Sequence, residues 1–280
     1  MKIFISTDME GVGGLPSWSD MEGPSRAANY ALAHRELSWM VNAMLSSEKG
    51  SQIEEICICD SHSRGEGIPY GLFGDSRVNH IRGFPRTYYM MQGLDESYDL
   101  AFLYGYHAKI GSERGGMDHS YSASAIYRVM INGKEVGEVE INSLLAGFYG
   151  VPVGLISGDD VLETELEGFF NSKPVFIRTK EGIGRFSAKM YPPERLEPLF
   201  RKGAVAAINS VNSFKAVQAP KSTKLKIELV STVIADAVSV IPGLHRTGGR
   251  SVEYKSSDFR DIYRMINSIA MLGGKFAAWT

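Results

Sequence analysis

Short apolar segments alternate with longer helical patterns over the first 160 residues, and this alternation limits the possible folds more than any other feature. Four segments have the length and composition of buried strands: residues 2–7, 54–60, 98–105 and 151–157. Residues 25–48 carry apolar side chains at helical spacing, and residues 141–149 predict a short helix. Strands that alternate with helices favour a parallel sheet in a layered α/β fold.

A hairpin is predicted between the third strand and the short helix. Residues 126–131 and 134–140 are strand-like, and Asn132-Gly133 separates them. An Asn-Gly pair favours a type I′ turn, because both residues tolerate positive φ. The alternating pattern places Glu138 on the second arm of this hairpin.

The pattern changes after about residue 165. Strand-like segments then lie at residues 174–180, 183–190, 226–231 and 251–256. Helical patterns lie at residues 192–210, 232–240 and 258–272. We therefore predict an α/β domain with a layered parallel sheet over residues 1–165 and a smaller α+β domain over residues 166–280.

Composition excludes several classes of partner. The formal net charge is −2 without long runs of one sign, so the surplus of basic residues that a nucleic-acid groove needs is missing. No apolar run reaches the roughly 20 residues that span a bilayer, and the acidic turn after residue 7 is unlike a signal peptide. Cys57 and Cys59 lie two positions apart on one strand, where a disulfide would be strained, so we expect reduced thiols in a cytoplasmic protein.

Residue types that bind metal ions lie at or near the ends of the predicted strands. Five residues form this set: Asp8, Glu10, His62, His107 and Glu138. In a parallel sheet the carboxyl ends of the strands meet at one rim, where ligands bind. Carboxylates and imidazoles suit Zn²⁺. Three carboxylates in one cleft raise each other's pKa unless cations neutralise them, so we expect two divalent ions that activate water and polarise a carbonyl.

Each member of the set has a simpler interpretation when it is taken alone. A strand-end aspartate such as Asp8 is often a turn or cap residue. His107 could be a hydrogen-bonded core histidine, and Glu138 a carboxylate on a solvent face. The metal site is favoured because several separate strand ends supply metal-binding residue types at the same rim. Three other histidines lack this placement and are interpreted as structural or surface residues: His34, His80 and His245.

Seven motifs, in order over residues 1–160, resemble the zinc-dependent D-aminopeptidases associated with dipeptide transport operons. They are STDMEG (6–11), CDSHS (59–63), GYHA (105–108), MDHS (117–120), ING with VGE (131–138), EINSLLAGFYGVPV (140–153) and SGDD (157–160). The motifs are specific as a group, and beyond residue 160 the resemblance is weaker.

This resemblance implies two zinc ions that Asp8 bridges, with the other four residues of the set completing the coordination. It also implies that His119 is catalytic, in a role that the family describes as a nucleophile. A hydroxide at the metal would attack more readily, so we expect His119 to donate a proton or to stabilise an oxyanion.

Four aspartates near the site are candidates for supporting roles. Asp60, Asp159 and Asp160 are candidates for orienting the metal ligands. Asp118 stands where the family has a small polar residue, and we expect it to raise the pKa of His119. The loop between His107 and His119 is also one residue longer than the family pattern.

The leading hypothesis is an aminopeptidase that hydrolyses short peptides with a D-amino acid at the N-terminus. One alternative, a dinuclear amidase or deacylase with a non-peptide substrate, uses the same residues. The other is a non-catalytic peptide-binding relative, which predicts no bound metal or a broken ligand set. The resemblance further implies a ring-like homo-oligomer that encloses the active sites. No nucleic-acid or membrane partner is expected.

Overall fold

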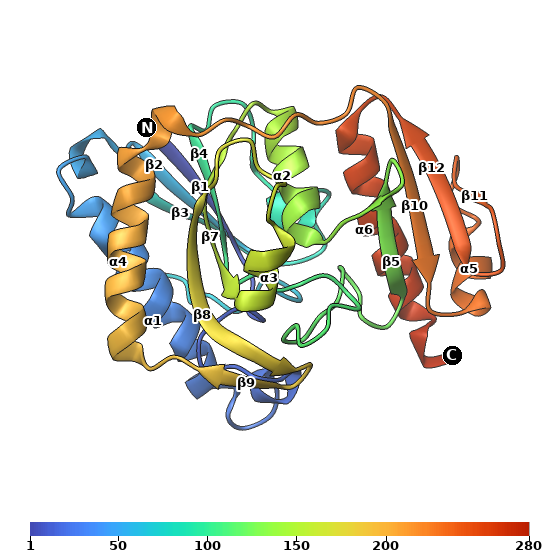
Figure 1. Ribbon diagram of the computed structural model, residues 1–280, viewed down its shortest axis with the longest axis horizontal. Helices are drawn as coiled ribbons and strands as arrows, with labels where there is room; N and C mark the ends of the chain where they lie inside the picture. The colour runs from blue at the N-terminus through green and yellow to red at the C-terminus, as the bar shows by residue number, and fades with distance from the viewer. Residues whose placement is uncertain (280) are drawn as a thin grey trace.

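Two β-sheets organise residues 1–279, which this computed structural model describes (Figure 1). The larger sheet has seven strands in the order β3-β2-β1-β4-β7-β8-β9, and the smaller has five in the order β11-β12-β10-β5-β6. The strands of the larger sheet are β1 (Lys2–Thr7), β2 (Glu55–Asp60), β3 (Val78–Ile81), β4 (Leu100–Tyr104), β7 (Val153–Asp159), β8 (Val175–Gly184) and β9 (Ser187–Met190). Those of the smaller are β5 (Ile126–Ile131), β6 (Lys134–Glu135), β10 (Thr223–Leu229), β11 (His245–Arg246) and β12 (Ser251–Ser256).

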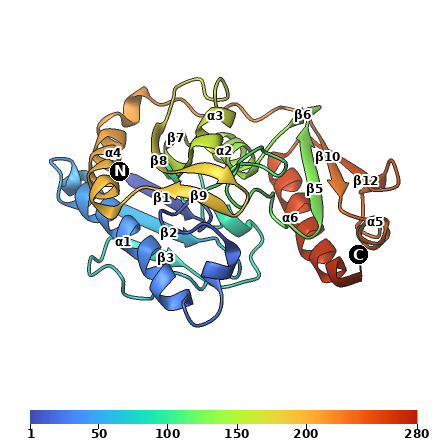
Figure 2. The same cartoon turned by 60° about the horizontal axis from the view of Figure 1, so that its bottom comes forward.

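Helices lie on both faces of the larger sheet. The α-helices are α1 (Arg26–Leu45), α2 (Glu138–Phe148), α3 (Asp160–Glu165), α4 (Pro193–Asn209), α5 (Thr232–Val238) and α6 (Phe259–Lys275). Helices α1 and α4 pack together on one face, while α2 lies on the other and contacts α6. Helix α6 runs beside β5, on the side of the smaller sheet that faces the larger one (Figure 2). The result is a stack of helix and sheet layers.

The alternation of side chains along β1 explains this layering. Ile3 and Ile5 are buried in one core cluster with residues of α1 and α4. Phe4 points to the opposite face and belongs to a second cluster, which continues into α2, α6 and the smaller sheet. Because successive residues of a strand face opposite sides, a strand covered on both faces is apolar throughout.

The expected layered α/β fold is confirmed. The six strands from β3 to β8 in the sheet order run parallel to one another. The edge strand β9 is antiparallel to β8. The predicted turn between β5 and β6 is also present, with φ of 50° at Asn132 and 81° at Gly133.

The predicted position of Glu138 on a hairpin arm is wrong. Strand β6 ends at Glu135, and Glu138 is the first residue of α2. Gly137 is the residue before the helix, and its N–H donates to the Glu140 carboxylate at 2.9 Å. This local cap outweighs the alternating pattern, because a carboxylate that accepts from the N-terminal backbone stabilises the first turn.

The two sheets exchange segments across the boundary expected near residue 165. Strand β5, from before it, pairs with β10 and with the edge strand β6 in the smaller sheet, while β8 and β9, from after it, extend the larger sheet. The division of the chain into two domains stays a prediction. Among residues 1–279, no helix is both long enough and apolar enough to cross a membrane.

Candidate active site

The carboxyl ends of three neighbouring strands supply most of the candidate site. Asp8 follows β1, His62 follows β2 and His107 follows β4, and these strands are adjacent in the sheet. Glu138 reaches the same place from the start of α2. Its carboxylate accepts a hydrogen bond from the backbone N–H of Tyr121 at 2.6 Å.

Asp8, Glu10 and His62 form one half of the cluster. Nδ1 of His62 lies 3.3 Å from Oδ1 of Asp8 and 3.2 Å from Oε2 of Glu10. Both carboxylates are buried. The structure therefore brings these three predicted residues together, although 52 residues separate Glu10 from His62.

His107 and Glu138 form the other half, next to Asp8. Nε2 of His107 lies 3.5 Å from Oδ2 of Asp8 and 3.6 Å from Oε1 of Glu138. Nδ1 of the same ring donates to the carbonyl of Ala108 at 2.8 Å. Nε2 is buried and has no hydrogen-bond partner. A buried polar atom without a partner is costly, so this nitrogen is suited to a ligand between it and the carboxylates.

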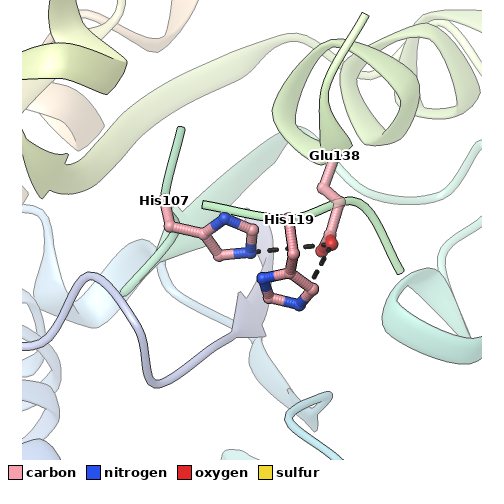
Figure 3. A group of neighbouring side chains, drawn as sticks. All are labelled: His107, His119 and Glu138. Carbon is pink, nitrogen blue, oxygen red and sulfur yellow. Dashed lines mark ion pairs between the residues drawn. The ribbon is translucent and has the colours of Figure 1, made fainter. Parts of the chain in front are cut away.

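His119 lies against His107 and Glu138 (Figure 3). The two imidazole rings stack with centroids 4.1 Å apart and planes 10° apart. Nε2 of His119 is 3.7 Å from Oε1 of Glu138, and Nδ1 donates to the carbonyl of Met117 at 3.0 Å. Because a carbonyl only accepts, the neutral ring carries its lone pair on Nε2, toward the cluster.

Burial and like charge shift the pKa values across the cluster. Burial, and next the carboxylate of Glu10, raise the pKa of Asp8 to about 7. Burial lowers the pKa of His107, but the carboxylates, Glu138 foremost, outweigh it and raise this pKa to about 10. Raised pKa values of this kind arise where acidic groups are packed together, and a bound cation removes the repulsion between them.

The residues meet the basic requirements of a metal site. Two groups of side chains each offer ligand atoms that lie within 4.8 Å of one another: Asp8, Glu10 and His107, and His107, His119 and Glu138. Two atoms that bind one zinc ion at about 2.0–2.1 Å with tetrahedral geometry are about 3.3 Å apart. The separations of 3.2–3.6 Å between the histidine nitrogens and the carboxylates are close to this value.

Trp18 is part of the site although its sequence context gave no signal for it. It lies in η1 (Trp18–Met21), and its indole Nε1 donates to Oε1 of Glu10 at 2.9 Å. The indole also packs edge-on against His119, with ring centroids 5.6 Å apart. Trp18 thus contacts Glu10, a metal-ligand candidate, and His119, the predicted catalytic histidine.

Lys180 was also missed, because a lysine at the end of a predicted strand usually faces solvent. It lies on β8 with 1% of its surface exposed. Its ammonium donates to the carbonyls of Glu10, Val12 and Leu15. Desolvation by burial lowers its pKa to about 8. Lys180 therefore fixes the loop that carries Glu10.

The expected effect of Asp118 on His119 is wrong. Asp118 is directed away, with Oδ2 accepting from the N–H of Gly111 at 2.6 Å and Oδ1 lying 3.1 Å from Nε of Arg185. Burial, and next the neighbouring His107, lower the pKa of His119 instead. Adjacent side chains in a loop point in different directions, so sequence proximity alone did not place this carboxylate.

The other aspartates fix loops around the site through backbone groups. Asp159 accepts from the N–H of Leu162 at 2.8 Å as the cap of α3, and from the N–H of Gly116 at 2.8 Å. Asp160 accepts from the N–H of Gly182, and Asp60 from that of Ile68, both at 2.7 Å. Asp159 thus supports the loop that leads to His119.

The remaining histidines and the cysteines lie outside the cluster. Nε2 of His34 is 2.7 Å from the carbonyl of Gly67, which fixes a loop near the site. His80 lies on β3 and His245 on β11. Both cysteines are buried as free thiols.

An α/β fold with a buried carboxylate and imidazole cluster at the carboxyl ends of its strands fits the class of metal-dependent hydrolases. Comparison with known proteins identifies the family. Residues 1–268 match the family model described as D-aminopeptidase (Peptidase_M55), and the chain belongs to that family. It is therefore an aminopeptidase, a hydrolase of peptide bonds, which confirms the leading class of enzyme expected from the sequence.

Two relatives show how far the similarity extends. The chain is 28% identical over 265 residues to the D-aminopeptidase of Bacillus subtilis (strain 168), covering 94% of each chain. It also resembles a solved structure, described as the Zn-dependent D-aminopeptidase DppA from Bacillus subtilis, a self-compartmentalizing protease. That match has a TM-score of 0.88 and 25% identity, and it covers 98% of both chains.

Proposed function

We propose that this protein is a dinuclear zinc aminopeptidase that hydrolyses short peptides with a D-amino acid at the N-terminus. The observation that carries the zinc proposal is the buried Nε2 of His107, which lies without a hydrogen-bond partner between Asp8 and Glu138. The description of the DppA structure as Zn-dependent supports the choice of metal. The family description supports D-amino acid specificity.

The two oxygens of Asp8 support a bridging role for this residue. Oδ1 faces His62 and Oδ2 faces His107. We propose that Asp8, Glu10 and His62 hold one zinc ion, and that Asp8, His107 and Glu138 hold the other. Four positive charges would then offset three carboxylates, which removes the repulsion that, after burial, raises the pKa of Asp8.

His119 is proposed to move a proton. When bound, zinc supplies a Lewis acid that polarises the scissile carbonyl and lowers the pKa of water. The lone pair on Nε2 of His119 accepts a proton during attack and returns it to the leaving amine. The lowered pKa of His119 keeps this nitrogen free near neutral pH. Met117 fixes the ring through its carbonyl.

The assembly and location are also proposals. The solved relative is described as a self-compartmentalizing protease. We propose that this chain likewise forms a homo-oligomeric ring around its active sites, and that it acts in the cytoplasm.

Metal content and substrate preference test the proposal together. We expect about two zinc ions per chain by elemental mass spectrometry, and cleavage of D-Ala-D-Ala at a much higher kcat/KM than L-Ala-L-Ala. The variant His107→Ala should lose one of the two zinc ions and most of the activity, because it removes a proposed ligand of the second ion, next to Asp8 and Glu138. His80→Ala, a histidine outside the cluster, should keep both.

Three outcomes would contradict separate parts of this proposal. Unchanged zinc content in His107→Ala would refute the metal site. Faster cleavage of the L-peptide would refute the D-specificity. Cleavage of N-acyl or cyclic amides without cleavage of any short peptide would identify the amidase alternative.

A further inference from the structure

A cavity of about 320 Å³ opens directly beside the cluster. Glu10 and His62 of the proposed metal site line it, together with Arg26 and Tyr30 from the first turns of α1. This volume is at the lower end of the range for small-molecule sites, so the cavity suits a short ligand.

Arg26 has the features of a ligand-binding side chain. Its guanidinium carbon lies 5.0 Å from the ring centroid of Tyr30, which is itself buried. Within residues 1–279, no carboxylate lies within ion-pair distance of Arg26. A guanidinium that stacks on an aromatic ring is held in place, and its planar donors match a carboxylate.

Arg64 lines the same cavity but is less suited to this role. Its side chain is 72% exposed, and its Nε lies 4.0 Å from Oε2 of Glu66. Arg26 is exposed as well, but Arg64 has the nearby Glu66 carboxylate, which competes for its charge. The guanidinium that is both held and unpaired is therefore Arg26.

Hydrogen bonds link the start of α1 to the cluster. Nδ2 of Asn29 donates to the carbonyl of Asp20 at 2.7 Å, which joins the first turn of α1 to η1. Trp18, also in η1, donates to Glu10 at 2.9 Å. The first turn of α1, which carries Arg26, is thus linked to Glu10 through two short segments.

The lining of the cavity carries charges of both signs. Glu22 and Glu66 add negative charge, and Arg26 and Arg64 add positive charge. A lining of this kind suits a zwitterion better than a polyanion. Trp18 and Met21 supply apolar surface for a small side chain.

We propose that Arg26 binds the free C-terminal carboxylate of a di- or tripeptide whose scissile carbonyl lies at the metal cluster. This inference rests on the proposed function, and it makes Arg26 a determinant of substrate length. The enzyme should require a free carboxylate close to the scissile bond, so blocked and long peptides are poor substrates.

Paired substrates test this role through kinetics. The zinc-loaded enzyme is assayed with D-Ala-D-Ala and with D-Ala-D-alaninamide, which lacks the negative charge. A hydrogen-bonded charge pair corresponds to about 10- to 100-fold in binding, so we expect a preference of that size for the free acid, mainly in KM. Arg26→Gln should remove the preference by lowering kcat/KM for the acid while leaving the amide within about twofold.

Arg35→Gln is the matched control, because Arg35 also lies on α1 and over an aromatic ring, at 5.4 Å from Trp39, but does not line the cavity. It should behave as the wild type. Equal rates for acid and amide in the wild type would overturn the inference. An equal loss on both substrates in Arg26→Gln, or the same selective loss in Arg35→Gln, would also overturn it.

A binding measurement separates this inference from the proposed function. The ligands are reduced-amide analogues of both peptides, in which CH₂–NH replaces the scissile amide and cannot be cleaved. Calorimetry should show tighter binding of the free acid to the wild type and not to Arg26→Gln. If that preference is present while neither peptide is cleaved, the proposed function fails and the carboxylate site stands. If both analogues bind equally, the carboxylate site fails whatever the activity.

Discussion

The stacked rings of His107 and His119 have opposite shifts in pKa. The His107 ring is buried and the His119 side chain is 14% exposed, and desolvation lowers the pKa of each. His107 lies within 3.6 Å of the oxygens of Asp8 and Glu138, and these carboxylates outweigh the effect of burial. His119 has Glu138 at 3.7 Å and the charge of His107 beside it, so its pKa stays low. Neighbouring imidazoles can thus serve as ligand and as proton carrier.

His119→Ala tests this division of roles. We expect the variant to keep its zinc and to lose about 10²- to 10⁴-fold in kcat, which is the usual contribution of general acid-base catalysis. Elemental analysis and steady-state kinetics measure the two effects separately. Loss of one zinc ion would show that His119 is a metal ligand, which its position beside His107 and Glu138 allows. A full rate would show that His119 has no catalytic role.

Strand β8 connects two loops of the active site. Lys180 binds three carbonyls of the loop that follows β1. Asp159, at the end of β7, accepts from Gly116 in the loop that leads to His119. At the far end of β8, the carbonyl of Arg185 accepts from the N–H of Met117 at 2.7 Å. The larger sheet therefore positions both loops relative to each other.

Lys180→Met should destabilise the protein by roughly 3 kcal/mol, because three buried carbonyls lose their donor and each unsatisfied group is costly. It should also weaken zinc binding, since the loop carrying Glu10 is released. Denaturant unfolding and zinc titration measure these effects. Lys189→Met, on β9 with its side chain 67% exposed, is the control and should change stability by less than about 0.5 kcal/mol. Equal stability of the two variants would contradict the role of Lys180.

At the scale of the whole molecule, Glu36 joins three parts of one core. Its carboxylate accepts from the N–H of Gly13 and from the hydroxyl of Tyr104, both at 3.0 Å. These contacts link α1, the loop after β1, and β4. Burial raises the pKa of Glu36 to about 8, far above the usual value of 4.5.

This shift predicts a pH dependence of stability. Between pH 4.5 and about 8, Glu36 is protonated in the folded chain and ionised in the unfolded chain. The folded state thus binds more protons, so the free energy of unfolding falls as the pH rises through this range, by at most about 1.4 kcal/mol per pH unit. Glu36→Gln mimics the protonated form and should reduce the slope in denaturant unfolding at pH 5 to 8. Glu197→Gln, on α4 with its side chain 42% exposed, should keep the slope, and an unchanged slope in Glu36→Gln would refute the prediction.

The sequence by itself predicted the elements whose periodicity is strong and the residue types of the site. Strand β12 was predicted at residues 251–256 with the bounds that the structure has, and α4 within one residue at each end. Asp8, Glu10, His62 and His107 were predicted together, because the carboxyl ends of parallel strands share a rim. Short-range spacing is sufficient for these features.

Only the tertiary structure decided the contacts between distant segments. It placed Glu138 at the start of a helix, turned Asp118 away from His119, and brought Trp18 and Lys180 to Glu10. Lys180 and Glu10 are 170 residues apart, and no local pattern encodes such a contact. Periodicity reports which face of an element is buried, whereas the partner of a buried polar group depends on how the layers pack.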